Sequence, residues 1–410
     1  MTRTVLLNGR LNGASNPQSV VIDGGIIAAV LDSAPPEVPG EVRIDLRGQI
    51  VLPGFVDGHA HIDKSLWGEP WVRRTSEEIS MEQMFADTLE DWEQTVTPVA
   101  LRATRFLGEC IRQGSTYVRT FADVDPQIGL DGLHGVFAAR EAFKGQLDMD
   151  VVAFGQLGVL RRPGTAKLLE EAIKAGATGV GGLDPADVDG RAGESLDTVF
   201  ELGAKYGVAV DIHMHESGQL GRWLISQIAE RTKALGLQGR VSLCDVFCLA
   251  DASPDELKRV GETLADAGIA VAVGVHGLLP VPDVRTLHGL GVKMCLGSDS
   301  SRSRWSPWGD GDILSRVTFL AYKRYFRRDE DLEFSLSMAG ELGREAMGQD
   351  SCLLRVGDSA DLVVLPGQAL AELVVLPPVR SLVMKGGQIV CRDGALVTAP
   401  AEVQQAAAVR

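Results

Sequence analysis

The chain has 410 residues, of which 45% are hydrophobic and 23% charged, a globular composition long enough for more than one domain. Its 40 Lys and Arg against 55 Asp and Glu give a net charge of −15. An acidic surface argues against nucleic acid and anionic membranes as partners, because both bind basic patches.

The chain starts without a long apolar run, and no window of about 20 residues is apolar throughout, so we expect neither a signal peptide nor a membrane span. Six cysteines are scattered along the chain, and none forms a Cys-x-x-Cys pair. Free buried thiols in a reducing compartment fit this pattern, so we expect a cytoplasmic protein.

Both ends of the chain predict short strands separated by turns. Asp23-Gly-Gly is a hairpin signal between two apolar runs, and Lys385-Gly-Gly has the same character near the other end. We therefore expect residues 1–52 and 346–410 to form one small β domain, a β-sandwich built from both termini.

The middle of the chain, residues 53–345, alternates strand-like and helix-like segments, which is typical of α/β folds with a parallel sheet. Eight strands with crossover helices close into a (β/α)8 TIM-type barrel, whose active sites lie at the carboxyl ends of the strands. The eight predicted strands are Phe55–Ile62, Thr116–Val124, Asp150–Leu157, Thr178–Leu183, Val208–His215, Val241–Phe247, Ile269–Val275 and Val292–Asp299.

Polar residues collect at the ends of these strands, where a barrel places its chemistry. His59 and His61 are two apart on the first strand, so their side chains point to one face. Four of the seven histidines lie at strand ends. The polar strand-end residues are His59, His61, Asp123, Gln156, His213, His215, Glu216, Asp245 and Asp299.

A catalytic metal needs three or four protein ligands and an open position for water. His59, His61, His213 and Asp299 supply four ligands for one divalent ion. Hydroxide formed from the bound water can attack an sp² carbon that carries an amino group. Glu216 suits the task of carrying a proton to the leaving nitrogen, and Asp299 can accept one from the water.

The run Pro53-Gly-Phe-Val-Asp57-Gly-His59-Ala-His61 resembles the first-strand signature of the amidohydrolase superfamily, and its continuation to Lys64 resembles the cytosine deaminase branch. The resemblance implies a (β/α)8 barrel with a small β domain and metal-assisted hydrolysis of a C–N bond. His213-Met-His-Glu216 is similar to the fifth-strand His-x-x-Glu, which implies a histidine ligand and a glutamate proton shuttle.

The resemblance extends to the other strand ends. Leu296-Gly-Ser-Asp299 is similar to the eighth-strand Gly-x-Asp of a metal-ligating aspartate. Gln156 matches a glutamine that hydrogen-bonds the substrate carbonyl. Trp305-Ser-Pro-Trp308 is similar to the loop that closes the site, so we expect Trp308 to contact substrate. The strand at residues 178–183 has no lysine to bridge two metals, which implies one ion, zinc or iron.

Two positions depart from the deaminase pattern. Asp245 stands where the sixth strand normally ends in a histidine, and Ser300 follows the metal aspartate where an aspartate is usual. Asp245 is therefore a candidate for catalysis or substrate binding: it can hydrogen-bond the water or pair with a cationic substrate nitrogen, or it marks a lost activity. His276 is a candidate replacement for the missing imidazole, and His215 a pocket residue beside the ligands.

Three functions stay open. The first is deamination of an aminated N-heterocycle of the cytosine class, and the second is release of an amine from an N-substituted triazine or cyclic urea. The third is a ligand-binding relative without catalysis. Arg302 and Arg304 are candidates for an anionic substrate group, although loop arginines are more often solvated. By analogy with similar barrels we expect a homo-oligomer.

Overall fold

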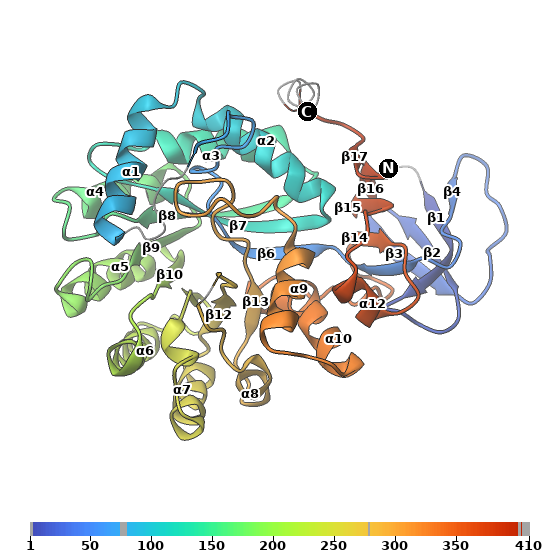
Figure 1. The fold of residues 1–410 in the computed structure, drawn as a ribbon. Coiled ribbons are helices and arrows are strands. Elements are labelled where there is room, and N and C mark those ends of the chain that lie inside the picture. Colours follow the sequence, from blue (N-terminus) through green and yellow to red (C-terminus); the bar gives the residue numbers. More distant parts are fainter. Residues whose placement is uncertain (1–2, 74–79, 278, 401–402, 404–410) are drawn as a thin grey trace.

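The computed structural model describes residues 3–73, 80–277, 279–400 and 403, which form a barrel with a smaller β domain at its side (Figure 1). Among these residues no helix combines the length and the apolar character that a bilayer crossing demands.

The barrel sheet has eight parallel strands in the order of the sequence, from β13 back to β6. All eight predicted strands are present, most of them shorter at their carboxyl ends than the prediction. They are β6 (Phe55–Ala60), β7 (Ser115–Asp123), β8 (Asp148–Gly155), β9 (Gly179–Leu183), β10 (Ala209–His213), β11 (Val241–Cys244), β12 (Ala270–Val273) and β13 (Met294–Leu296).

The first and last strands close the barrel beside the predicted metal ligands. Ala60 and Asp299 form a parallel bridge, in which the Asp299 N–H donates to the His59 carbonyl at 2.8 Å. The His61 N–H donates to the Asp299 carbonyl at 3.1 Å. Backbone pairing therefore fixes His59 of β6 and His61, just after β6, against the aspartate that follows β13.

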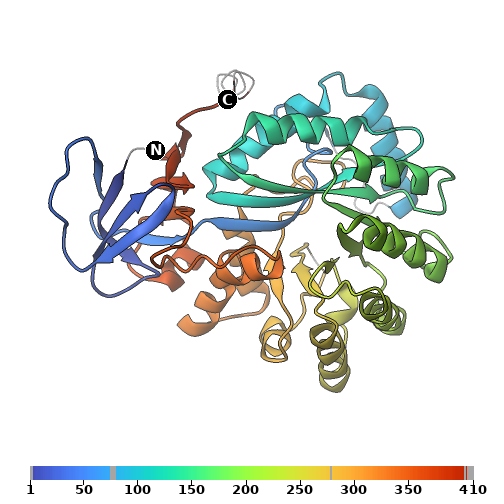
Figure 2. The same cartoon turned by 180° about the vertical axis from the view of Figure 1, so that it is seen from behind.

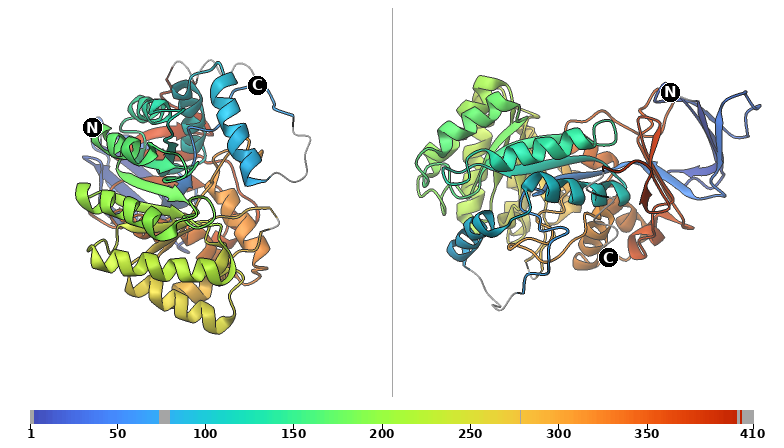
Figure 3. Two further views of the ribbon diagram at one scale, coloured as in Figure 1. Left: turned by 90° about the vertical axis from the view of Figure 1, so that its left-hand side faces the viewer. Right: turned by 90° about the horizontal axis from the view of Figure 1, so that it is seen from above.

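Helices pack around the barrel (Figure 3), many of them through one apolar face. In α7, Ser253 and Glu256 form a capping box and Pro254 occupies the first turn, while Leu257 and Leu264 are buried. The helices are α1 (Met81–Gln94), α2 (Val99–Arg112), α3 (Asp131–Ala142), α4 (Thr165–Ala175), α5 (Ala192–Tyr206), α6 (Gly218–Ala234), α7 (Pro254–Asp266), α8 (Val284–Gly289), α9 (Ile313–Lys323), α10 (Asp329–Ser337), α11 (Glu341–Ala346) and α12 (Leu370–Val375).

The second sheet combines strands from both ends of the chain, which lie side by side in Figure 2. Strand β14 joins the two ends, because it pairs antiparallel with β5 on one side and with β15 on the other. The strands are β1 (Thr4–Leu11), β2 (Gln18–Asp23), β3 (Ile26–Leu31), β4 (Val42–Asp45), β5 (Ile50–Pro53), β14 (Leu362–Leu365), β15 (Leu382–Lys385), β16 (Gln388–Arg392) and β17 (Ala395–Leu396). The fold is the predicted TIM-type barrel with a small β-sandwich domain.

Candidate metal centre and active site

Three imidazoles and a carboxylate converge at the carboxyl ends of the barrel strands. His59, His61 and His213 each offer a nitrogen, and these atoms lie within 4.8 Å of one another. The Nε2 atoms of His59 and His61 are 3.1 Å apart, and Asp299 Oδ1 is 3.4 Å from the first and 3.6 Å from the second. The structure thus brings together the four ligands predicted from the sequence.

The chemistry of this donor set fits a divalent cation. Burial is the main reason why the pKa values of His61 and His213 lie well below the ordinary range, so both rings are neutral and can offer lone pairs. The buried nitrogens without a hydrogen-bond partner among the described side chains are Nδ1 of His59, Nδ1 of His61 and Nε2 of His213. The Nε2 atoms of His59 and His61 instead face each other and Asp299 Oδ1, and acceptors that converge in this way are what a bound metal satisfies.

Asp57, from the first-strand motif, locks the ligand strands together. Its buried Oδ1 accepts hydrogen bonds from the N–H of Ser298 at 3.0 Å and from the N–H of His59 at 3.3 Å. Asp299 itself has a φ of 55°, a left-handed turn that directs the chain out of β13. The side chains of His59 and Asp299 are therefore held by backbone contacts as well as by packing.

Glu216 lies just beyond β10 and is 2% exposed. Its Oε1 accepts a hydrogen bond from the Ala186 N–H at 2.9 Å, while its buried Oε2 has no partner among the described residues. Burial, together with the nearby Asp184, raises the pKa of Glu216 to about 8. A carboxyl group with a raised pKa and a free oxygen can both release and take up a proton near neutral pH.

Asp245 follows β11 and faces imidazoles from three other strands. His276 Nε2 is 2.8 Å from Asp245 Oδ1, and the rings of His59 and His215 each have a nitrogen 3.8 Å from Oδ2. Burial would raise the pKa of Asp245, but His276 and its other imidazole neighbours hold it well below the usual range. Asp245 is therefore an ionised carboxylate next to a candidate ligand.

His276 reaches the site from the segment after β12. Besides its contact with Asp245, its Nδ1 lies 3.8 Å from Asp299 Oδ2. Burial would lower the pKa of His276, but Asp245 and Asp299 raise it above the ordinary value. The sixth strand leads into Asp245 instead of a histidine. His276, which follows the seventh strand, thus places an imidazole in the same neighbourhood.

Lys64 and Gln156 form a polar pair on the opposite wall. Lys64 Nζ donates to Gln156 Oε1 and to Asp123 Oδ1, both at 2.9 Å. Because the Gln156 carbonyl oxygen accepts from Lys64, its amide N–H groups are left for a carbonyl acceptor. Lys64 is both ion-paired and part of the cavity wall.

These residues surround a cavity of about 840 Å³. His61, His213 and Asp299 lie in its wall, as do His215, Asp245 and His276. The other side of the cavity is formed by the Trp305–Trp308 loop and by one face of α9. The cavity connects the candidate metal centre with solvent.

A sequence model described as the amidohydrolase family matches residues 73–391 of the chain. This chain belongs to the amidohydrolase family. It is similar to N-isopropylammelide isopropyl amidohydrolase of Pseudomonas sp. (strain ADP), with 28% identity over 399 residues that cover 94% of this chain and 97% of the relative. It is also 25% identical to a pterin deaminase of Rhizobium rhizogenes over 400 residues, 91% of this chain and 88% of the relative.

Solved structures agree with this membership. The crystal structure of N-isopropylammelide isopropylaminohydrolase from Burkholderia multivorans is 36% identical to the amidohydrolase described here, with a TM-score of 0.92 over 97% of this chain and 100% of that chain. A 5-methylcytosine deaminase from Klebsiella pneumoniae, at 23% identity and a TM-score of 0.81 over 97% and 100% of the two chains, shares the fold. The homologues hydrolyse C–N bonds, and this amidohydrolase is an enzyme of that kind acting on a small molecule.

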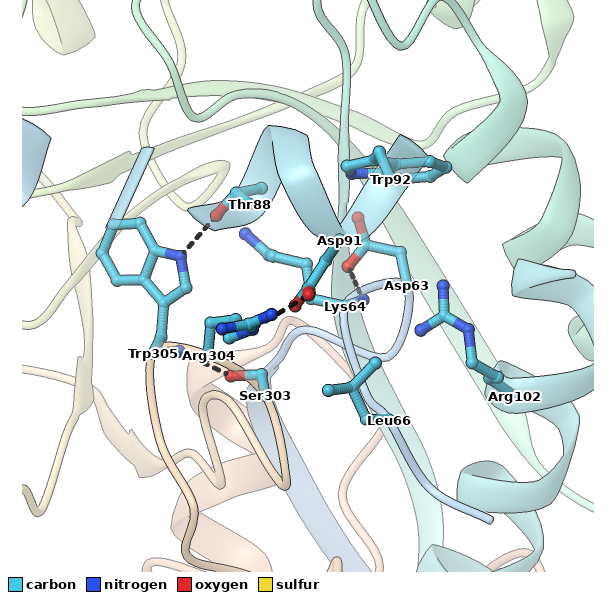
Figure 4. Close-up of a pocket in the computed structure, with 10 residues that line it drawn as sticks. All are labelled: Asp63, Lys64, Leu66, Thr88, Asp91, Trp92, Arg102, Ser303, Arg304 and Trp305. Carbon is cyan, nitrogen blue, oxygen red and sulfur yellow. Dashed lines mark hydrogen bonds and ion pairs between the residues drawn. The ribbon is translucent and has the colours of Figure 1, made fainter. Parts of the chain in front are cut away.

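The loop after Asp299 contacts α1 at the entrance (Figure 4). Trp305 Nε1 donates to Thr88 Oγ1 at 2.9 Å, and Arg304 Nε pairs with Asp91 Oδ1 at the same distance. Trp308, expected to bind substrate, lines the 840 Å³ cavity and is 72% exposed. Arg304 belongs to this contact between loop and helix, so its side chain does not line the large cavity.

Three residues of the site were not singled out from the sequence. Asp211 lies under the cluster, with Oδ1 3.5 Å from His213 Nε2, a position from which a carboxylate orients a ligand imidazole. Arg316 and Lys323 lie on the cavity face of α9. They are seven residues apart, and Phe319 and Tyr322 fall between them on the same stripe of the helix, which is the signal that would have found them.

Proposed function

We propose that this amidohydrolase cleaves the exocyclic C–N bond of an N-substituted aminoheterocycle, such as a triazine or cyclic urea, and releases an amine. The observation that carries the proposal is the position of the candidate ligands His61, His213 and Asp299 in the wall of an 840 Å³ cavity. That volume lies in the upper part of the range of about 300–1,000 Å³ for small-molecule sites, and a bare heterocycle needs less. The similarity to two N-isopropylammelide hydrolases supports the same reaction.

One divalent ion, zinc or iron, would be held by His59, His61, His213 and Asp299, and when bound it supplies Lewis acidity and an acidified water. Gln156 donates its amide N–H to a ring carbonyl, and Lys64 fixes the orientation of that amide. The Trp305–Trp308 loop limits access of bulk water to the ring.

Two carboxylates move the protons in this scheme. Asp299 accepts a proton from the attacking water, and Glu216 delivers one to the leaving nitrogen through its unpartnered oxygen. Water thus provides OH to the ring carbon and H to the amine, so the C–N bond is replaced by a C–O bond. Asp245 favours the charged form of the His276 imidazole and directs it toward Asp299.

Release of ammonia is the second candidate function. The similarity to a pterin deaminase supports it, and the same ligands and Glu216 would serve. The two reactions differ in the leaving group alone, so product analysis separates them.

The test measures both products. Purified protein is reconstituted separately with zinc and with ferrous iron and incubated with matched pairs of N-alkylamino and amino forms of triazines, pyrimidines and pterins. We expect alkylamine release to exceed ammonia release. Ammonia from the unsubstituted rings alone would favour the second function, and silence on every ring with metal bound would favour a ligand-binding protein.

A further inference from the structure

One face of α9 gives the outer cavity a chemical character that the proposed reaction does not use. Arg316, Phe319, Tyr322 and Lys323 follow one another at helical spacing, and all four line the cavity. Trp308 lines it from the loop before α9. We define these five residues as the outer chamber.

The two cations of the outer chamber have no anionic partner in the part of the chain that the structure describes. Arg316 is 8% exposed, and the hydrogen bond it makes is from Nη2 to the Ser298 carbonyl at 2.9 Å. Lys323 Nζ donates to the carbonyl oxygens of His276, at 2.6 Å, and Leu279. Neutral acceptors leave both positive charges uncompensated, whereas buried charges are normally paired.

Other arginines near the site are paired or stacked. Arg304 pairs with Asp91, and Arg302 donates to the Glu69 carbonyl and lies over the rings of Trp67 and Trp71. Among the described residues that line the cavity, Lys64 pairs with Asp123, and uncompensated positive charge is therefore confined to Arg316 and Lys323.

The loop before α9 presents Arg316 to the cavity. Gly309 has a φ of 99°, and a Cβ there would lie 2.8 Å from Arg316 Nη2. Only a glycine lets the loop backbone approach the guanidinium this closely. The loop thus shields Arg316 from solvent on one side and leaves the cavity side as the place for a partner.

We infer that the outer chamber binds a carboxylate carried on the amine substituent of the substrate. This inference rests on the proposed amine release and names the class of leaving group: an amino acid or another carboxyalkyl or carboxyaryl amine. The guanidinium of Arg316 matches a carboxylate with two parallel N–H donors. Phe319, Tyr322 and Trp308 supply apolar walls for the carbon atoms between the ring nitrogen and the carboxylate.

Arg316 is the direct partner and Lys323 the outer one. Their backbone positions lie two helical turns apart, roughly 10 Å. Arg316 bonds the carbonyl of Ser298, the residue before Asp299, so it lies on the metal side of the chamber. Lys323, nearer the end of α9, raises the positive potential of the entrance and favours entry of an anion.

A carboxylate suits this chamber better than a phosphate. One guanidinium with one Nη already engaged, and a lysine that already donates to two carbonyls, leave few free donors. A phosphate carries up to two charges and more acceptor oxygens than these donors satisfy.

The alternative is that both cations only hold the loops that carry Ser298 and His276. That role predicts equal losses for charged and neutral substrates when a cation is removed. A role in binding a carboxylate predicts a loss for the charged substrate that exceeds the loss for the neutral one.

The experiment uses zinc-reconstituted protein and three aminotriazines that differ at one position: N-carboxyethyl, N-propyl and N-phosphonoethyl. kcat/KM for release of each amine is measured, together with the dissociation constant of each ring ligand for the Glu216→Gln protein. We expect the carboxylate to be preferred over propyl, and Arg316→Gln to reduce that preference about 10–100-fold. Arg316→Lys should keep part of the preference for the carboxylate substrate.

Lys323→Gln should reduce the same preference less and make it less sensitive to salt. Arg324→Gln is the matched control, because Arg324 pairs with Asp283 and does not line the cavity. Equal effects of Arg316→Gln on carboxyethyl and propyl substrates, or a preference for phosphonate, would overturn the inference. Turnover of none of the three would count against amine release itself, while the dissociation constants would still test the chamber.

Discussion

The unpartnered oxygen of Glu216 makes this residue the best place to test the chemistry. Glu216→Gln keeps the size and the hydrogen bond from Ala186 but cannot carry a proton. Because general acid–base catalysis contributes about 10²–10⁴-fold, we expect kcat to fall by that amount with little change in ligand binding. Amine release by stopped assay measures kcat, and calorimetry measures binding.

Glu230→Gln provides the control, since this glutamate is exposed on α6. A Glu216→Gln enzyme with native kcat would show that another group delivers the proton.

A second prediction for a single residue concerns Asp245. Its carboxylate lies 3.8 Å from His59 and 2.8 Å from His276, so it stabilises the ligand cluster electrostatically. Asp245→Asn preserves the shape and removes the charge. Loss of such a partner of a ligand costs about 10–100-fold in metal affinity or activity, so we expect zinc to be lost to a chelator at correspondingly lower concentration.

Asp245→His extends this argument to the residue found in the deaminase branch. In this chain a third imidazole would face His215 and His276, and it would replace the carboxylate that helps to raise the pKa values of both. We therefore expect Asp245→His to lose activity. Asp255→Asn, an exposed substitution on α7, is the control for both variants. A gain of deaminase activity in Asp245→His would instead mean that the native site is impaired.

The ligands could be predicted from sequence because each one ends an apolar strand, and barrel topology brings all strand ends to one rim. The partnership of Asp245 with His276 could not. It depends on the left-handed turn at Asp245, with φ 55°, and on the course of the segment after β12, and neither has a sequence signal as strong as a strand. Arg316 was also missed, because its role depends on the absence of an acidic partner nearby in the fold, among the described residues, and this absence has no signal in the sequence.

At the scale of elements, α1 and the Trp305–Trp308 loop contact each other and both line the cavity. The indole N–H of Trp305 meets the Thr88 hydroxyl, which in turn donates to the Met84 carbonyl of the same helix. Trp305→Phe and Thr88→Val each remove this hydrogen bond. A hydrogen bond of about 0.5–1.5 kcal/mol converts to a roughly 2–13-fold rise in KM.

The two variants also test the contact as a pair. Because they remove one shared interaction, the double variant should lose no more than either single one. Hydrogen exchange in α1 should accelerate in all three, and Thr88→Ser, which keeps the hydroxyl, should behave as native. Additive effects on KM would mean that Trp305 and Thr88 act separately.

The strands were predictable to within a few residues because each is an apolar run bounded by turn residues. Helices α4 and α7 were equally clear, since each repeats its apolar residues every three or four positions. Helix α1 is different: Phe85 and Thr88 are its buried residues, so its place follows from the contacts with Trp305 and Arg304 rather than from its own apolar face.

At the scale of the whole molecule, a buried lysine joins the two sheets. Lys385 of β15 donates to Asp361, beside β14, and to Asp148 at the start of β8, each at 2.6 Å. Asp361 is 1% exposed and Lys385 8%. Burial alone would raise the pKa of Asp361, but Lys385 and the Gly386 N–H lower it below the ordinary value. The native ion pair therefore stabilises the fold at neutral pH.

Replacing Lys385 changes the ionised Asp361 carboxylate from a group that stabilises the fold into one that destabilises it. In Lys385→Met the buried Asp361 carboxylate keeps only the more distant Arg344, at 3.8 Å, as a cation among the described residues, so at pH 7 we expect a loss near the lower end of about 3–5 kcal/mol in the free energy of unfolding. The native pair contributes fully above the unfolded pKa of about 3.9 and is lost as the pH falls through the lower folded value. In the variant, protonation of Asp361 relieves the cost instead.

The two proteins should therefore converge in stability as the pH falls from 7 toward about 4, although both become less stable overall. Urea unfolding followed by tryptophan fluorescence at several pH values measures the difference. Lys144→Met is the matched control, because Lys144 forms an exposed pair with Glu141 on the surface and should change little at any pH. A difference between native and Lys385→Met that stayed constant with pH would mean that Lys385 contributes through packing of its methylene chain, and that the charge on Asp361 does not couple the barrel to the small domain.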